Sequence, residues 1–494
     1  MMHNFVIINP DEWRGDYAGC YGHPLVKTPH LDRLAAEGTR FENAFVQHTV
    51  CTPSRCSFMT GWYPHVTGHR SLWHSLRPHE PNLLKYLKQA GYEVAWFGKN
   101  DLLAAESFND SVDYYDDFPG FLPNDIENAF EYGEPGYFSF LYKPTPRTIH
   151  EHVDALKVKA GIDFLNRPHE KPFCLYLPLS TPHCPYTAPQ PYHDMYDPED
   201  VPPLVQPEEC SDKPRYYKRI RETRDMDETP EWVFKKLNAV YLGTITMIDE
   251  MIGWLLDALD QNGLTENTTV LFFTDHGDYA GDYRMVEKWT AGLEDCLIRT
   301  PFVIRTPGGK AGHVVKEPVE VFDQMATILD LAGIEAQHNH FARSLAPQLH
   351  GEAGDPNRAA FAEGGYALYE PHCFEAPPVE LDPDWEGDPK NSYYPKINLN
   401  RTDPDAVGRC SMIRTLGHKL IRRPGTGEHE LYDLEKDPQE RRNVYADPDY
   451  ADVRADLEKR LLDWYIETSD VTPFDRDNRG MPPNSVYWRR LTIK

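Results

Sequence analysis

Two pairs of residues in the sequence could bind a divalent metal ion. Asp11 and Glu12 follow one short apolar run, and Asp275 and His276 follow another. Runs of this kind are typical of buried strands, so each pair should stand at the carboxyl end of a strand. Either pair alone would more often be loop acids or helix caps. Because both pairs occur, they predict a site for Ca²⁺, Mg²⁺ or Mn²⁺, which prefer oxygen ligands.

A third segment could supply a nucleophile. Cys51 begins the pattern Cys51-Thr52-Pro53-Ser54-Arg55, and Pro53 fits the first turn of a helix. Cys51 would then lie at a helix N-terminus, where free N–H groups and the helix dipole favour negative charge. The planar guanidinium of Arg55 suits a sulfate or phosphate group. Without such surroundings, a cysteine four residues before an arginine is most often a buried structural thiol.

Three further side chains could bind an anion or transfer a proton. Lys99, His183 and Lys288 each come after an apolar run. Taken singly, each would more often be a solvated lysine or a hydrogen-bonded histidine. Gathered at one edge of a sheet, they would surround an anion beside the metal.

Apolar runs alternate with amphipathic segments along most of the chain. The predicted strands cover residues 5–9, 93–98, 173–179, 269–274 and 301–305, and the predicted helices cover residues 31–38, 82–91, 150–165 and 231–259. This alternation indicates an α/β fold with a mostly parallel sheet flanked by helices. Ligands of such sheets bind outside the carboxyl ends of the strands, where the acidic pairs are expected.

The length of 494 residues predicts at least two domains. We expect a catalytic domain at 1–370, a Pro- and acid-rich linker or insertion at 371–408, and a small α+β domain with a tail at 409–494. Within the last part, residues 410–423 read as a strand pair and residues 450–465 as an amphipathic helix.

The formal net charge of −27 argues against nucleic acid and anionic membranes as partners, because the field would repel phosphates. A small anionic substrate remains compatible with a local basic pocket. No stretch approaches the about 18 apolar residues of a membrane span. The start lacks the features of a secretory signal, and the nine scattered cysteines suggest reduced thiols, so we expect a cytoplasmic protein.

Together these motifs resemble the type I sulfatase family of the alkaline phosphatase superfamily. The segment from Cys51 to Gly61 is similar to the family's first signature, C-x-P-x-R with a trailing T-G, and the segment from Gly91 to Lys99 is similar to its second. Further matches follow in the family's order at 16–22, 28–34, 182–185, 274–277, Lys288 with Glu294, 430–434 and 437–438. The resemblance implies an alkaline-phosphatase-like α/β fold with a smaller C-terminal α+β domain.

The resemblance also implies a modified nucleophile. A separate maturation enzyme would oxidise Cys51 to formylglycine, whose hydrate offers one hydroxyl for attack and a second for release of the sulfate. One divalent cation, Ca²⁺ before Mg²⁺ or Mn²⁺, would be held by Asp11, Glu12, residue 51, Asp275 and His276. The expected substrate is a small anion: a sulfated sugar or an aryl or alkyl sulfate.

The remaining roles that the resemblance implies concern charge and protons. Arg55, Lys99 and Lys288 would neutralise charge in the transition state. His183 or Lys288 would protonate the leaving alcohol. The expected reaction is therefore the metal-dependent hydrolysis of a sulfate ester.

Two positions depart from the family's pattern. Glu12 stands where the family usually has a second aspartate. Asp101 stands where the second signature usually has a histidine, a candidate base for the elimination of sulfate. Because a carboxylate can act as a base, Asp101 is one candidate for this role, and His69 or His74 is the alternative.

The segment 68–76 follows the nucleophile segment and should line the pocket. Its residues Arg70, Trp73 and His74 are therefore predicted substrate contacts. The substrate itself depends on loops, which carry specificity on a fixed scaffold.

Other functions fit some of these residues. A phosphonate monoester or phosphodiester hydrolase of the same superfamily would share the formylglycine and the metal. The Asp275-His276 pair in place of Asp-Asn, and Asp101 in place of the usual histidine, leave this alternative function open. A catalytically silent, sugar-binding relative is the alternative of another class, although every charged role is filled here. Cys51 and Cys56 as a zinc or redox pair lack a second Cys or His pair. A homo-oligomer is compatible with the sequence.

Overall fold

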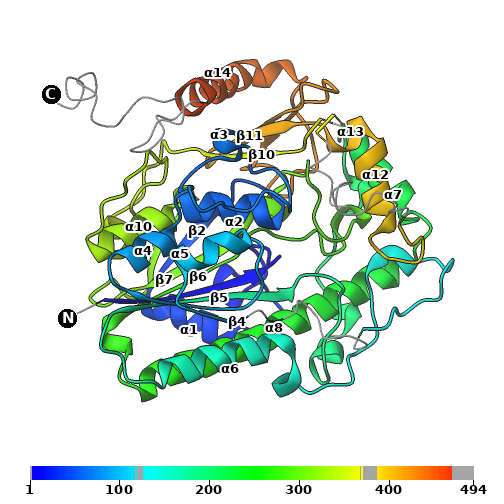
Figure 1. Ribbon diagram of the computed structural model, residues 1–494. Helices are drawn as coiled ribbons and strands as arrows, with labels where there is room; N and C mark the ends of the chain where they lie inside the picture. The colour runs from blue at the N-terminus through cyan, green and yellow to red at the C-terminus, as the bar shows by residue number, and fades with distance from the viewer. Residues whose placement is uncertain (1–2, 117, 119–125, 368, 371–386, 470–494) are drawn as a thin grey trace.

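A nine-stranded sheet lies at the centre of the protein, with β1 and β6 near its middle (Figure 1). The computed structural model describes residues 3–116, 118, 126–367, 369–370 and 387–469. The strands are β1 (Asn4–Asp11), β2 (Thr39–Phe45), β3 (Glu93–Phe97), β4 (Tyr114–Asp116), β5 (Phe173–Pro182), β6 (Thr268–Phe273), β7 (Arg299–Arg305), β8 (His313–Val315) and β9 (Val319–Glu320). Their order is β4-β3-β5-β1-β6-β7-β2-β8, with β9 paired to β2.

The sheet is mostly parallel, which confirms the predicted fold class. β4, β3, β5, β1 and β6 form one parallel run. β7 is antiparallel to both of its neighbours, β6 and β2. β1 and β5 are buried along their whole length, as expected for strands covered on both faces.

Helices cover both faces of this sheet (Figure 1). One face carries α1 (Pro29–Glu37), α6 (Val153–Leu165) and α8 (Glu231–Gln261); the other carries α2 (Cys51–Thr60), α4 (Leu83–Gln89), α5 (Phe108–Ser111) and α10 (Asp323–Ala332). The expectation that no stretch approaches the apolar character of a membrane span was wrong for α8. This helix is long and apolar enough to cross a membrane, yet 83% of its most apolar 18 residues are buried inside the protein, as in a core helix.

A second, antiparallel sheet forms the C-terminal part, in the order β10-β11-β12-β13. Its strands are β10 (Ala360–Gly364), β11 (Cys410–Arg414), β12 (His418–Arg422) and β13 (Glu430–Asp433), and α14 (Ala451–Thr468) packs on it. The strand pair and the helix predicted here are both present. β10 lies before the predicted boundary at residue 370, yet it pairs with β11, which lies after that boundary. This pairing joins segments that are distant in the sequence.

The predicted linker is partly ordered into helices. Residues 371–386 lie outside the described residues, but α12 (Tyr394–Thr402) and α13 (Pro404–Val407) follow them. Both helices contact α7 (Arg215–Thr223) of the preceding part of the chain. The second half of this segment therefore packs against the larger domain.

Candidate active site

The carboxyl ends of two neighbouring strands bring the predicted metal ligands together. β1 and β6 are parallel and pair as far as Ile8 and Phe272. Asp11 is the last residue of β1, and Asp275 and His276 follow β6 by two and three residues. All three side chains are fully buried. The strand register therefore brings the two segments together at the carboxyl-terminal ends of the central strands.

Helix α2 delivers Cys51 to the same point. Cys51 is the first residue of α2, Pro53 lies in its first turn, and Val50 before it is extended. The hydroxyl of Ser54 donates a hydrogen bond to the carbonyl oxygen of Asp275 over 2.6 Å, which ties the helix start to the end of β6. The predicted helix N-terminus at Cys51 is therefore confirmed, and the helix dipole favours negative charge there.

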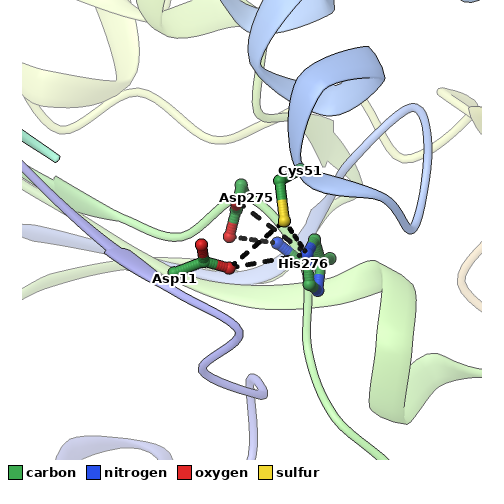
Figure 2. A group of neighbouring side chains, drawn as sticks. All are labelled: Asp11, Cys51, Asp275 and His276. Atoms are coloured by element: carbon green, nitrogen blue, oxygen red, sulfur yellow. Dashed lines mark hydrogen bonds and ion pairs between the residues drawn. The ribbon is translucent and has the colours of Figure 1, made fainter. Parts of the chain in front are cut away.

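Four side chains form a tight, buried group at this point (Figure 2). The potential ligand atoms of Asp11, Cys51, Asp275 and His276 all lie within 4.8 Å of one another. The thiol sulfur of Cys51 is 3.2 Å from Nε2 of His276 and 3.5 Å from Oδ1 of Asp11. Nδ1 of His276 lies 2.9 Å from the carbonyl oxygen of Gly277. A proton on Nδ1 would leave the Nε2 lone pair directed at the group.

The chemistry of this group fits a divalent cation. Two buried carboxylates and one imidazole nitrogen converge, and this oxygen-rich donor set suits Ca²⁺, Mg²⁺ or Mn²⁺. The carboxylate of Glu12 is outside this group, although its backbone N–H donates to Oδ1 of Asp275 over 3.1 Å. Among the described residues, no hydrogen-bond partner reaches Oε1 of Glu12, so this buried oxygen is also free to bind a cation.

Two cations border the carboxylates of this group. The guanidinium of Arg55 contacts Oδ2 of Asp275 at 2.8 Å and Oδ2 of Asp11 at 3.4 Å, and it is fully buried. The ammonium of Lys99 lies 2.6 Å from Oδ2 of Asp11 and 4.0 Å from the sulfur of Cys51. Burial alone would raise the pKa of the Asp11 carboxyl, but Lys99 and Arg55 outweigh it and hold that pKa well below its usual range.

Lys288 and His183 contact each other beside Glu12. The ammonium of Lys288 lies 2.5 Å from Nε2 of His183 and 3.3 Å from Oε2 of Glu12. Nδ1 of His183 lies 2.6 Å from the carbonyl oxygen of Cys184. Burial and the neighbouring Lys288 hold the pKa of His183 well below its usual range. A neutral His183 with its proton on Nδ1 would donate to the carbonyl oxygen of Cys184 and accept a hydrogen bond from Lys288 at Nε2.

Asp101 and His69, two residues that could replace the family's usual histidine, have different hydrogen-bond and ion-pair partners. Oδ2 of Asp101 lies 2.7 Å from the ammonium of Lys99, so Asp101 pairs with a cation of the site. Both ring nitrogens of His69 are engaged within its own loop, with the carbonyl oxygen of His74 and with Oε1 of Glu80 at 2.9 Å. The geometry therefore brings Asp101 to Lys99, whereas the ring nitrogens of His69 contact residues of its own loop.

The segment with the predicted substrate contacts lies against α2. The hydroxyl of Thr52 is 3.3 Å from the carbonyl oxygen of Leu72, and the thiol of Cys56 is 3.6 Å from that of His74. Trp73 is 41% exposed, which leaves its ring accessible to a ligand. The roles of Arg70, Trp73 and His74 in substrate binding stay predictions.

Two arrangements could not be read from the sequence. Cys51 and Cys56 point to different neighbours, the metal-ligand group and the 68–76 segment, so they do not form the zinc or redox pair considered above. Glu287 was missed, although it precedes Lys288 directly; its carboxylate lies 3.4 Å from the Lys288 ammonium and 2.8 Å from the guanidinium of Arg224. Adjacency to a candidate lysine was the only local signal.

The fold and the buried group together are typical of a hydrolase of the alkaline-phosphatase-like type. The Sulfatase family matches residues 3–334, and the family described as N-sulphoglucosamine sulphohydrolase, C-terminal, matches residues 384–467. An ulvan-active sulfatase of Formosa agariphila is 33% identical over 389 residues, which cover 74% of this chain and 69% of that protein. The chain therefore belongs to the sulfatase family and is a sulfuric ester hydrolase.

Solved structures agree with this fold. The phosphonate monoester hydrolase of Agrobacterium radiobacter gives a TM-score of 0.74 at 24% identity, covering 94% of this chain and 96% of its own. A protein solved in complex with its substrate D-glucosamine-2-N,6-O-disulfate gives a TM-score of 0.72 at 22% identity, covering 95% of this chain and 98% of its own. At these identities the likeness concerns the alkaline-phosphatase-like fold alone.

Proposed function

We propose that the protein hydrolyses the sulfate ester of a sugar, with a formylglycine made from Cys51 as its nucleophile and one divalent cation. The observation that carries this proposal is the buried group of Asp11, Cys51, Asp275 and His276 at the N-terminus of α2. These four residues would hold the cation, with Glu12 as a further candidate ligand. When bound, the cation would lower the pKa of the attacking hydroxyl and polarise the sulfuryl oxygens. Oxygen-rich ligands suit Ca²⁺, Mg²⁺ and Mn²⁺ alike, and we propose Ca²⁺ because the resemblance to the sulfatase family implies it.

The oxidised side chain at residue 51 would supply a hydrated aldehyde, which a separate maturation enzyme must generate. Arg55 and Lys99 would balance negative charge on the sulfuryl group, since both border the carboxylates beside residue 51. The 2.5 Å contact between the Lys288 ammonium and Nε2 of His183 supports placing the transferred proton on Lys288, because a neutral His183 would offer its Nε2 lone pair to the ammonium. Lys288 would therefore protonate the leaving alcohol, with His183 orienting it.

The sugar substrate rests on the relatives. One is described as ulvan-active, and one solved neighbour carries a disulfated glucosamine as its substrate. An anionic sugar also fits a site bordered by Arg55, Lys99 and Lys288 within a chain of net charge −27, because nearby buried cations act more strongly than a distant, screened surface. Arg70, Trp73 and His74 are proposed to contact the sugar.

A second function is the hydrolysis of phosphonate monoesters or phosphodiesters. The solved structure of the Agrobacterium radiobacter hydrolase supports this alternative through its similar fold, and the Asp275-His276 pair keeps it open. The third reading, a silent sugar-binding relative, is disfavoured because all the proposed charged roles are filled.

The test is a direct comparison on one preparation of the matured enzyme. Sulfated monosaccharides, aryl sulfates, phosphodiesters and phosphonate monoesters would be assayed under the same conditions. We expect the highest kcat/KM for a sulfated sugar. A higher kcat/KM for a phosphodiester or phosphonate would favour the alternative, and no turnover of any ester would favour the silent relative.

A further inference from the structure

A buried carboxylate lies directly behind the proposed acid. Glu287 is fully buried, and its Oε1 lies 2.6 Å from the ammonium of Lys396, while its Oε2 lies 2.8 Å from the guanidinium of Arg224. Oε1 of Glu287 is also 3.4 Å from the ammonium of Lys288. One carboxylate is therefore shared among three cations, and one of these cations is the proposed proton donor.

Lys396 comes from a distant part of the chain. It lies on α12, in the region that matches the C-terminal sulphohydrolase family, and it is 109 residues from Glu287 in sequence. Its side chain is fully buried. A fully buried lysine is rare unless it is paired, and Glu287 supplies the paired carboxylate for Lys396.

We propose that Glu287 and Lys396 are positioning residues, which hold the Lys288 ammonium against His183 and Glu12 so that it can protonate the leaving alcohol. The C-terminal segment would then take part in the chemistry of a site that is otherwise built from the larger domain. This inference rests on the proposed function, because it requires Lys288 to be the acid.

The charges around Glu287 explain why Lys396 matters. With Lys396 and Arg224 present, the carboxylate is balanced by two cations other than Lys288, and Lys288 can turn toward His183 and Glu12. Without Lys396, Lys288 would be the one cation left at Oε1 of Glu287 among the residues that the structure describes. In a buried site such a charge imbalance is costly, so the Lys288 ammonium would be drawn toward Glu287 and away from the leaving group.

The backbone next to Lys288 offers little freedom to compensate. Glu287 adopts a left-handed conformation with φ of 66°, which is uncommon for a residue other than glycine. Its N–H donates to Oδ1 of Asp278 over 3.0 Å, and its carbonyl oxygen accepts from the N–H of Tyr279 over 3.0 Å. With the backbone held at both groups, a change in the charge balance must be taken up by the Lys288 side chain.

The test uses the full, matured enzyme and a series of para-substituted phenyl sulfates. A poor leaving group needs protonation more than a good one, so loss of the acid's position steepens the dependence of kcat on leaving-group acidity. We expect Lys396→Met to lower kcat about 10–100-fold for the poorest leaving group, a typical cost of losing an outer-sphere partner. We expect a much smaller loss for 4-nitrophenyl sulfate and little change in KM. Lys390→Met, at an exposed lysine just before α12, is the matched control and should leave the series unchanged.

A second pair of variants separates positioning from folding. Lys396→Arg keeps the charge and should retain most of the rate. Lys396→Met combined with Glu287→Gln removes the carboxylate that would attract Lys288, and it should recover much of the rate on poor leaving groups. Equal losses across the whole series, or no recovery in the double variant, would overturn the positioning role.

Lys288→Ala distinguishes a failure of this inference from a failure of the proposed function. If Lys288→Ala steepens the leaving-group dependence and Lys396→Met does not, Lys288 is the acid and the positioning role is wrong. If Lys288→Ala leaves that dependence unchanged, the acid is assigned wrongly, and the positioning role is overturned with it.

Discussion

The two sides of the active site are built in different ways. The cation-binding side, Asp11, Asp275 and His276, lies at the ends of two adjacent parallel strands. The proton-transfer side, Lys288 with His183 and Glu12, depends on the loop after β6 and on a network that reaches α12. Strand ends give the first side a rigid frame, whereas the second depends on the balance of buried charges. The two sides should therefore respond differently to substitution.

The largest effect should follow from removing a carboxylate on the cation-binding side. Asp11→Ala or Asp275→Ala should abolish binding of the divalent cation and reduce turnover to background, because each removes a buried anionic ligand from a group of four. Metal content by elemental analysis and turnover of a sulfate ester measure both effects, and circular dichroism checks the fold. Asp163→Ala, at an exposed position of α6, is the control. Wild-type metal content in either variant would remove that residue from the cation site.

Loss of the proposed acid should have the next largest effect. Lys288→Ala should lower kcat about 10²–10³-fold, the usual cost of removing one preorganised charged group. The cation should still bind, since Lys288 contacts Glu12 rather than the four-residue group. Lys236 on α8 is a poor control, because its ammonium pairs with Asp194 at 2.6 Å. The exposed Lys159 is therefore the better control, and equal effects of the two alanine variants would exclude Lys288 from catalysis.

Asp101 should contribute less, through Lys99. The ion pair between Asp101 and Lys99 at 2.7 Å favours an orienting role over that of elimination base. Asp101→Asn should then slow the first step, by about 10-fold as for other outer-sphere partners, without a burst of alcohol product. Single-turnover kinetics would check this prediction. A burst equal to the enzyme concentration, with a sulfated enzyme visible by mass spectrometry, would instead identify Asp101 as the base.

The smallest predicted effect is on stability and lies outside both sides of the site. Asp249 on α8 accepts hydrogen bonds from the N–H groups of His30 and Leu31, yet burial raises its pKa to about 7. Because this pKa is above that of the unfolded chain, its stabilising contribution is complete below about pH 4 and is lost as the pH rises through 7.

Asp249→Asn keeps an acceptor for these N–H groups but cannot ionise. The melting temperature of the variant relative to the wild type should therefore rise between pH 5 and pH 8, by an amount on the order of 3 °C. Thermal unfolding at the two pH values measures this difference. A relative melting temperature that falls over the same range would show that the carboxylate is stabilising when charged.

The same contrast between the two sides explains what the sequence could predict. Strand ends, the helix start at Cys51 and the parallel sheet followed from local patterns, because apolar runs, prolines and adjacent acids act over a few residues. The contact of Lys396 with Glu287 and the pairing of β10 with β11 join residues far apart in the chain, so no local pattern carries them. The proton on Lys288 likewise depends on His183, which only the fold brings near.

The central claim, that an oxidised residue 51 is the nucleophile, is tested most directly by correlating its oxidation with turnover. Preparations expressed with different amounts of a maturation enzyme would be analysed by peptide mass spectrometry across Cys51, and their kcat for a sulfate ester would be measured. We expect kcat to rise in proportion to the fraction of formylglycine and to approach zero where the thiol is intact. Full turnover by a preparation in which Cys51 is entirely unmodified would contradict the account.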